Sequence, residues 1–377
     1  MSSLYVHIPF CASKCPYCDF FSQVGSQQHI DEYVELLNLN IEILKRNSSP
    51  SPPFSTIFFG GGTPSLLSSR QIESILNSLE QNFGIAMDAE ITLEANPGTV
   101  DLAKLQGYRQ AGVNRLSLGI QSLTEKNLKL LGRIHSVKQA RESIFAARTA
   151  GFDNLSLDLM FALPSQDLRS LEQEVSALLN LNPEHISLYG LSFEEGTEFS
   201  LRRQSGELAS CGDNLYADQY QLLHDQLVAA DYEHYEISNF AQPGQRCRHN
   251  QIYWQRRNCL AIGAGAHSFI EQGWGERWHI PTNLQKYKES LLQGENPAEL
   301  LETYDHQGAM REFVYLALRT SGGADLHEFK RRFERPMEEV FSVALKNTGK
   351  YLHSNNDHYS FEQTGWLLYD HLISHFL

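Results

Sequence analysis

The sequence predicts an α/β protein whose strands run parallel within one sheet. Short apolar runs rich in β-branched residues recur through the first half of the chain, and helical patterns separate them. Each run is nearly continuously apolar, as expected of a strand buried on both faces. The predicted strands are Leu4–Ile8, Thr56–Phe59, Ile91–Ala95, Arg115–Gly119, Leu155–Leu159 and Ile186–Tyr189. A barrel and a doubly wound sheet both fit this alternation.

Apolar residues at helical spacing predict the helices between these strands. Ser68 with Gln71, and Ser136 with Gln139, are capping-box patterns that open two of the helices. The predicted helices cover residues 30–44, 69–83, 137–150, 168–179 and 215–227. Polar residues follow the strands at their carboxyl ends, where both kinds of α/β fold have their catalytic and ligand-binding residues.

The second half of the chain has a different pattern. Residues 232–297 are rich in Trp, Tyr, Asn and Gly, which indicates loops with short strands. Beyond them, helices are predicted at 310–318, at 340–345 and from Gln363, with a hairpin turning at Asn355-Asn356-Asp357. We predict three parts: a main domain over 1–231, a loop-rich extension over 232–300, and a small winged-helix-like α+β module over 301–377.

The 377-residue chain is acidic, with 31 Lys and Arg against 45 Asp and Glu, a formal charge of −14. That balance disfavours nonspecific binding to nucleic acid. Residues 301–377 hold 8 basic and 11 acidic side chains, so the small module is not expected to read DNA either. No secretory signal or transmembrane segment is recognisable, and a cytoplasmic location is predicted.

Three of the six cysteines form a CxxxCxxC motif directly after the first strand. Cys11, Cys15 and Cys18 can supply three thiolates to a [4Fe–4S] cluster and leave one iron open. Zinc usually takes four closed ligands, and no second CxxC pair is present. The alternative is a chance cluster of buried cysteines.

The motif resembles that of the radical S-adenosylmethionine (SAM) superfamily. The resemblance implies a partial (β/α)6 TIM-like barrel, a [4Fe–4S] cluster on Cys11, Cys15 and Cys18, and SAM on its open iron. It also implies a SAM site at the matching strand ends and at the glycine-rich element Gly60–Pro64. The residues to which the resemblance assigns SAM binding are Tyr5, Tyr17, Gly61, Gly62, Thr63, Glu94, Gln121, Arg133, Asp158 and Ser192.

Within the superfamily, the whole chain resembles the oxygen-independent coproporphyrinogen III dehydrogenase-like group. The dehydrogenases carry a fourth cysteine two residues after the third, where this chain has Phe20. That feature is similar to the HemW family of heme chaperones. His249, Tyr253 and Trp254 match the HNxxYW motif that this family is thought to use for heme, and Cys247 and His267 are secondary ligand candidates.

A basic stretch surrounds this motif. No Asp or Glu occurs between Ile237 and Ile270, whereas Arg246, Arg248, Arg256 and Arg257 do. These arginines could bind heme propionates, because guanidinium groups pair well with carboxylates. Pairing with acids elsewhere in the fold is an equal alternative.

Together these features predict a chaperone that binds heme as cargo and transfers it to an acceptor protein. The alternative is a SAM-dependent oxidoreductase that acts on coproporphyrinogen III. The sequence leaves open whether SAM is cleaved, which would require an electron donor, or is only bound. It leaves open a monomeric or dimeric state, peripheral membrane contact, and the identity of the acceptor.

Overall fold

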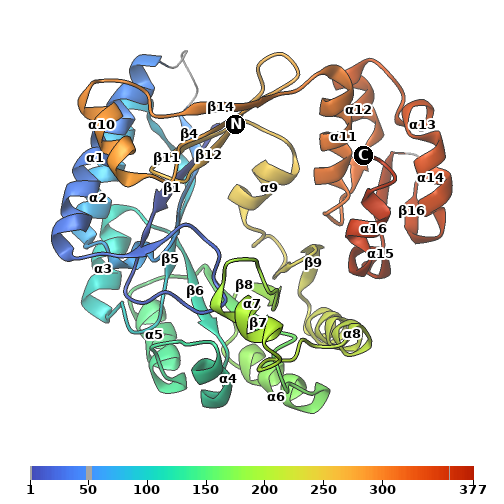
Figure 1. Cartoon of the computed structure of the whole chain (residues 1–377), viewed down its shortest axis with the longest axis horizontal. Helices are drawn as coiled ribbons and strands as arrows, with labels where there is room; N and C mark the ends of the chain where they lie inside the picture. The colour runs from blue at the N-terminus through green and yellow to red at the C-terminus, as the bar shows by residue number, and fades with distance from the viewer. Residues whose placement is uncertain (1, 48–52, 356) are drawn as a thin grey trace.

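The structure is a computed structural model that describes residues 2–47, 53–355 and 357–377 (Figure 1). Its main feature is an open 12-stranded sheet in which β1, β4, β5, β6, β7 and β8 are parallel neighbours. These strands are Ser2–Ile8, Phe54–Gly61, Ile85–Ala95, Arg115–Gln121, Leu155–Phe161 and His185–Gly190. All six predicted strands are therefore confirmed. The sheet ends at β9 (Glu233–Glu236) and β14 (Glu299–Thr303), so it is a partial barrel.

Helices cover the outer face of this curved sheet (Figure 1). The predicted ones are present as α1 (Gln27–Asn47), α2 (Ser69–Phe83), α5 (Val137–Thr149), α6 (Leu168–Leu179) and α8 (Asp213–Ala229). Both predicted capping boxes form. Three further helices were not predicted: α3 (Leu102–Ala111), α4 (Glu125–Leu130) and α7 (Glu198–Gln204).

The two faces of the parallel strands differ in polarity. Residues such as Ile57, Leu93 and Leu116 are fully buried in the main hydrophobic core. Polar residues alternate with them along the strands and point to the inner face of the sheet. There Ser156 bonds to His185, and Thr56 bonds to His249. The strands are therefore buried on both faces, as predicted, and polar residues on their inner face line the site.

The next part of the chain extends both edges of the sheet. It forms β10 (Asn239–Ala241), β11 (Cys259–Ile262), β12 (His267–Ile270), β13 (Glu276–His279) and α10 (Leu284–Leu292). The chain between β10 and β11 forms helix α9 (Arg248–Trp254). This helix contacts both β4 and α11 (His306–Ala317) (Figure 1).

The C-terminal module combines helices with a three-stranded sheet and has its own buried core. After α11 come β15 (Ala324–Asp325), α12 (Leu326–Phe333), α13 (Met337–Val340), α14 (Ser342–Thr348), β16 (Leu352–Ser354), β17 (His358–Phe361), α15 (Gln363–Leu367) and α16 (Tyr369–Ile373). The predicted hairpin is confirmed by antiparallel pairing of β16 and β17, while Asn356 of its turn lies outside the described residues.

One predicted helix in this module is interrupted at a single residue. The continuous helix expected over 340–345 is divided, because Phe341 leaves the helical conformation, with φ −114° and ψ 25°. The Phe341 ring is buried in the module core. Elsewhere, β14 spans the predicted boundary at 300/301, and the three-part division of the chain stays a prediction. Within the described residues, no helix is both long and apolar enough to cross a membrane.

Candidate cluster and cofactor site

A cavity of about 360 Å³ lies at the carboxyl ends of the parallel strands. It is lined by residues from the cysteine loop and from all of β4 to β8 or the loops that follow them. Of the predicted site residues, it collects Cys11, Cys15, Tyr17, Cys18, Gly61, Gly62, Thr63, Glu94, Gln121, Arg133, Asp158 and Ser192. Residues more than 170 positions apart in the sequence thus line one cavity, as the parallel topology predicts.

The cysteine loop starts on the short strand β2 (Phe10–Cys11), which pairs with β3 (Gln23–Val24). A turn bond of 3.1 Å from the Cys18 amide to the Cys15 carbonyl tightens the loop. All three cysteines are free thiols and partly exposed. Burial raises the pKa of Cys18 above that of an ordinary thiol.

Polar donors from neighbouring strands reach two of the three sulfurs. The Thr63 hydroxyl donates to Cys11 Sγ and Arg133 Nη1 donates to Cys15 Sγ, each over 3.5 Å. Asn96 holds both donors in place, since its amide donates to Thr63 over 3.0 Å and its carbonyl accepts from Arg133. Hydrogen bonds to sulfur stabilise the thiolate form that iron requires.

Three thiolates on one loop, two of them with hydrogen-bond donors, fit the ligand set of a [4Fe–4S] cluster. In the described part of the chain, no three His, Cys, Asp or Glu side chains converge on a single-ion site. Thiolates of a [4Fe–4S] cluster each bind a different iron and need not converge. Arg133 also keeps a buried Nε without a partner among the described residues, beside the cavity in which an anionic ligand would sit.

The glycine-rich element brings the backbone close to the cysteine loop. The Gly62 amide donates to the Ile8 carbonyl over 2.8 Å. A Cβ atom at Gly62 would lie 2.6 Å from the Phe10 carbonyl oxygen, directly before Cys11. Gly61 has a φ of +109°, a conformation that side chains disfavour.

We therefore expect Gly62→Ala to destabilise the fold, by about 1–3 kcal/mol, because the backbone of β2 would have to move. Urea unfolding measures the effect. Gly349→Ala is the matched control, since Gly349 has an ordinary helical φ of −53° and no atom within 4 Å of an added Cβ. Equal unfolding free energies for the two variants would contradict the close approach.

Two carboxyl groups lie on the floor of the cavity. Glu94 Oε2 accepts from the Gly61 amide over 3.2 Å, and Asp158 accepts from the Ser117 hydroxyl over 3.0 Å. Burial, and secondly the charge of Asp158, raise the pKa of Glu94 to about 8. Burial also raises the pKa of Asp158. In the ligand-free protein, Glu94 is therefore mostly protonated at neutral pH.

This shift predicts a pH-dependent stability. Between the ordinary Glu pKa of 4.5 and about 8, the unfolded chain releases the Glu94 proton while the folded protein keeps it. The free energy of unfolding therefore falls as pH rises through this window, by at most about 1.4 kcal/mol per pH unit. In urea unfolding from pH 6 to 8, Glu94→Gln should lose this slope. If the unfolding free energies of the wild type and Glu94→Gln ran parallel against pH, Glu94 would have an ordinary pKa in the folded protein.

The remaining SAM candidate lies below the cavity. Tyr5 is outside its lining, and its hydroxyl bonds to His7 Nδ1 over 3.2 Å. Its ring stacks on Phe58, a residue of the neighbouring strand β4. The lining residues that sequence reasoning missed include Ser117, Met160 and Tyr189. The alternation of side chains along β6, β7 and β8 could have found them, because each lies two residues from another inward-facing position.

The HNxxYW residues lie on α9, away from this cavity. His249 is buried, with Nδ1 2.8 Å from the Thr56 hydroxyl and Nε2 2.9 Å from the Tyr253 hydroxyl. Burial, and secondly Arg115, lower the pKa of His249 to about 3. Glu90 fixes the start of the helix by accepting from the amides of Arg248 and His249 over 3.0 and 2.9 Å. Both ring nitrogens are thus occupied, and iron ligation by His249 would require these bonds to open.

Of the secondary ligand candidates, Cys247 is fully buried directly before α9, and burial raises its pKa to about 12. His267 is on β12, where its ring stacks against His279 at 5.9 Å.

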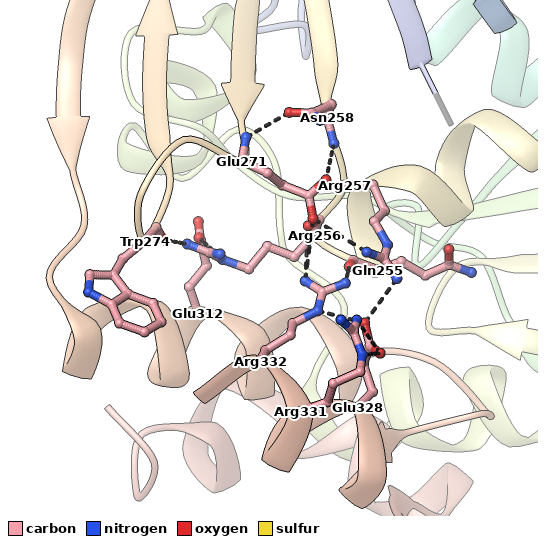
Figure 2. A network of polar contacts seen from close by, with 10 residues as sticks. All are labelled: Gln255, Arg256, Arg257, Asn258, Glu271, Trp274, Glu312, Glu328, Arg331 and Arg332. Atoms are coloured by element: carbon pink, nitrogen blue, oxygen red, sulfur yellow. Dashed lines mark hydrogen bonds and ion pairs between the residues drawn. The ribbon is translucent and has the colours of Figure 1, made fainter. Parts of the chain in front are cut away.

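The arginines near the motif all have acidic partners. Arg246 pairs with Glu233, and Arg248 with Asp88. Arg256 is 5% exposed and binds Glu312 over 2.6 Å, while Arg257 joins Glu271 and Glu328. Figure 2 shows these last pairs as one network between the β11–β12 region and helices α11 and α12. All four arginines thus have acidic partners within the fold, and the pair of Arg256 is the most buried.

Comparisons with known proteins agree with this geometry. The model of the radical SAM superfamily matches residues 5–178, and that of the HemN C-terminal domain matches 304–368. The heme chaperone HemW of Bacillus subtilis (strain 168) is 33% identical over 100% of this chain and 99% of the relative. That of Escherichia coli (strain K12) is 41% identical over 71% of this chain and 70% of the relative.

Among solved structures, the radical SAM enzyme coproporphyrinogen III oxidase (HemN) from Escherichia coli has a TM-score of 0.85. It is 24% identical, with 100% of this chain and 89% of that chain covered, and this likeness shows the fold alone. The partial barrel, the cysteine loop and the matched superfamily model define a radical SAM protein. Within that class, the chain belongs to the HemW family. Membership of the superfamily implies a [4Fe–4S] cluster and SAM binding.

Proposed function

We propose that the protein is a heme chaperone, which binds heme and transfers it to an acceptor protein. The observation that carries this proposal is the relationship to curated heme chaperones over the full length of the chain. Phe20 supports it, because this exposed side chain lines the cysteine cavity at the position where the dehydrogenases have a fourth cysteine. A cytoplasmic location is part of the proposal.

The proposed cluster ligands are Cys11, Cys15 and Cys18, supported by their shared cavity and by the donors Thr63 and Arg133. The open iron would hold the amino and carboxylate groups of SAM. When bound, the cluster supplies one-electron chemistry, and an electron donor is needed only if SAM is cleaved.

The other residues of the cavity would hold the rest of SAM. Glu94 and Asp158 offer carboxylate oxygens to ribose hydroxyls or to the SAM ammonium group, and Gly61 and Gly62 leave room for its methionine part. Tyr17 lines the same cavity and offers a flat face to the adenine. Gln121 and Ser192 add polar contacts, while Tyr5 would act from beneath the floor.

For heme, the proposed contributions of the HNxxYW motif differ between its residues. Trp254 is on the side of α9 that faces the C-terminal module, where a second cavity lies. His249 bonds both to Tyr253 and to Thr56 of β4, and so holds the helix that carries Trp254.

An activity assay separates this function from the alternative. The purified protein is reconstituted with its cluster under anaerobic conditions and incubated with coproporphyrinogen III, SAM and a reductant. A heme chaperone forms no protoporphyrinogen, whereas an oxidoreductase forms it together with 5′-deoxyadenosine. Such coupled product formation would overturn the proposal in favour of the enzyme.

A further inference from the structure

A second cavity lies between α9 and the C-terminal module. Its volume is about 380 Å³, within the range of roughly 300–1,000 Å³ typical of small-molecule sites. Trp254 and Gln251 line it from α9, Phe313 from α11, and His358 from β17. The cavity is separate from the cysteine site, and none of the SAM candidates lines it.

The wall of this cavity is rich in arginine. Arg246, Arg257 and Arg332 line it, against Asp325 and Glu328 as the acids. Arg246 uses only its Nε in hydrogen bonding within the described part of the chain, to Glu233 over 2.7 Å, so its two terminal nitrogens remain available. The side chains of Arg246 and Arg257 are 37% and 36% exposed, unlike the buried Arg256. Arg246 can therefore add a carboxylate without the cost of opening a buried pair, whereas both terminal nitrogens of Arg257 already bind Glu271 and Glu328.

Figure 2 shows how one side of this wall is kept in place. Arg332 donates to the carbonyls of Gln255 and Arg256 over 3.3 Å each, and its Nε binds Glu328 over 2.6 Å. Glu328 in turn accepts from Arg257 over 2.9 Å. The end of α9 and helix α12 are therefore joined, and the cationic wall is preorganised before any ligand binds.

The cavity also contains aromatic side chains and an unsatisfied donor. Trp254 and Phe313 contribute aromatic rings to the lining, and the guanidinium groups of Arg319 and Arg332 lie over these rings at 4.9 and 5.4 Å. The indole N–H of Trp254 is buried and has no acceptor among the described residues.

His358 is the histidine of this cavity. Its Nε2 lies 3.5 Å from Asp325 Oδ2, while its Nδ1 has no hydrogen-bond partner among the described residues. Histidines that bind metals commonly have a carboxylate beside their other ring nitrogen, as Asp325 lies beside Nε2 of His358. The side chain is 39% exposed, so Nδ1 is accessible without disruption of the core. His249, in contrast, has both ring nitrogens occupied.

We propose that the cavity between α9 and the C-terminal module binds the heme cargo, with His358 as an axial ligand of the iron and Arg246 on a propionate. This inference rests on the proposed function. It places the cargo next to Trp254 of the motif and outside the cysteine cavity.

Titration of ferric heme into the full-length protein, followed by absorption spectroscopy, tests the iron ligand. We expect His358→Ala to lower the affinity by more than about tenfold, the least that loss of a second-shell partner typically costs. His358→Tyr should retain heme with a shifted absorption band, which a merely structural role would not produce. His327→Ala is the matched control, since His327 also pairs with an acid, Asp357, in the same module but outside the cavity.

Heme dimethyl ester, which has no free carboxylates, tests the propionate contact. Arg246→Gln should weaken heme binding about tenfold, as expected for a charge-assisted hydrogen bond, and leave binding of the ester unchanged. Arg331→Gln is the control, because Arg331 pairs with Glu328 from outside the cavity. Equal losses for heme and ester would overturn the propionate contact.

The outcomes also separate this inference from the proposed function. If the wild-type protein binds heme and His358→Ala keeps the same affinity and spectrum, while His249→Ala loses both, the placement is wrong and the chaperone function stands. If the wild-type protein binds no heme, both fail.

Discussion

Replacing any one of Cys11, Cys15 or Cys18 with alanine should abolish the [4Fe–4S] cluster. Each thiolate binds a different iron, and no further cysteine lines the cavity to substitute for a lost ligand. Iron and sulfide analysis after anaerobic reconstitution, together with the cluster absorption, measures the effect. We expect iron and sulfide to fall to background in all three variants.

The control for this experiment is Cys211→Ala. Cys211 is also a partly exposed free thiol, but it lies outside the cavity, so its loss should leave iron and sulfide unchanged. Folding of each variant is checked by circular dichroism without reconstitution. Normal iron content in any of the three loop variants would contradict the assignment of that cysteine as a ligand.

Replacing Glu312 with alanine should be strongly destabilising. Glu312 is 9% exposed and pairs with both Arg256 and Arg277, and it accepts from the Tyr304 hydroxyl over 2.6 Å. Its removal leaves the 5%-exposed Arg256 as an uncompensated buried charge. Breaking a buried ion pair by removing one partner costs about 3–5 kcal/mol.

Urea unfolding of the full chain measures this loss. Glu338→Ala on α13 is the control, since Glu338 is exposed and its truncation should change the unfolding free energy by less than about 0.5 kcal/mol. Glu312→Gln keeps the hydrogen-bond acceptor and should recover part of the stability. Equal stability of Glu312→Ala and the wild type would show that the network of Figure 2 is not buried in solution.

Much of the fold could be predicted because hydrophobic periodicity and capping are local signals. The pattern of Ser68 with Gln71 opens α2, and that of Ser136 with Gln139 opens α5, as expected. Helix α3 was missed because only Leu105 and Tyr108 of its residues are buried, too few to give a clear apolar stripe. The break at Phe341 depends on tertiary packing of its ring, which no local pattern reveals.

The site shows the same division between local and long-range information. The cysteine loop and the strand ends could be placed together because parallel strands bring their carboxyl ends to one edge. The partners of the arginines could not be predicted, because Arg256 and Glu312 are 56 residues apart and meet only in the folded chain. The burial of His249 against Thr56, 193 residues away, was inaccessible for the same reason.

The most direct test of the chaperone function is heme transfer. The reconstituted protein is loaded with heme, separated from free heme, and mixed with a heme-free acceptor such as apomyoglobin, while absorption spectra follow the heme. We predict stoichiometric loading, then loss of the protein's heme band with matching gain of the acceptor's band. Absence of specific loading, or heme that the protein never releases to an acceptor, would contradict the account.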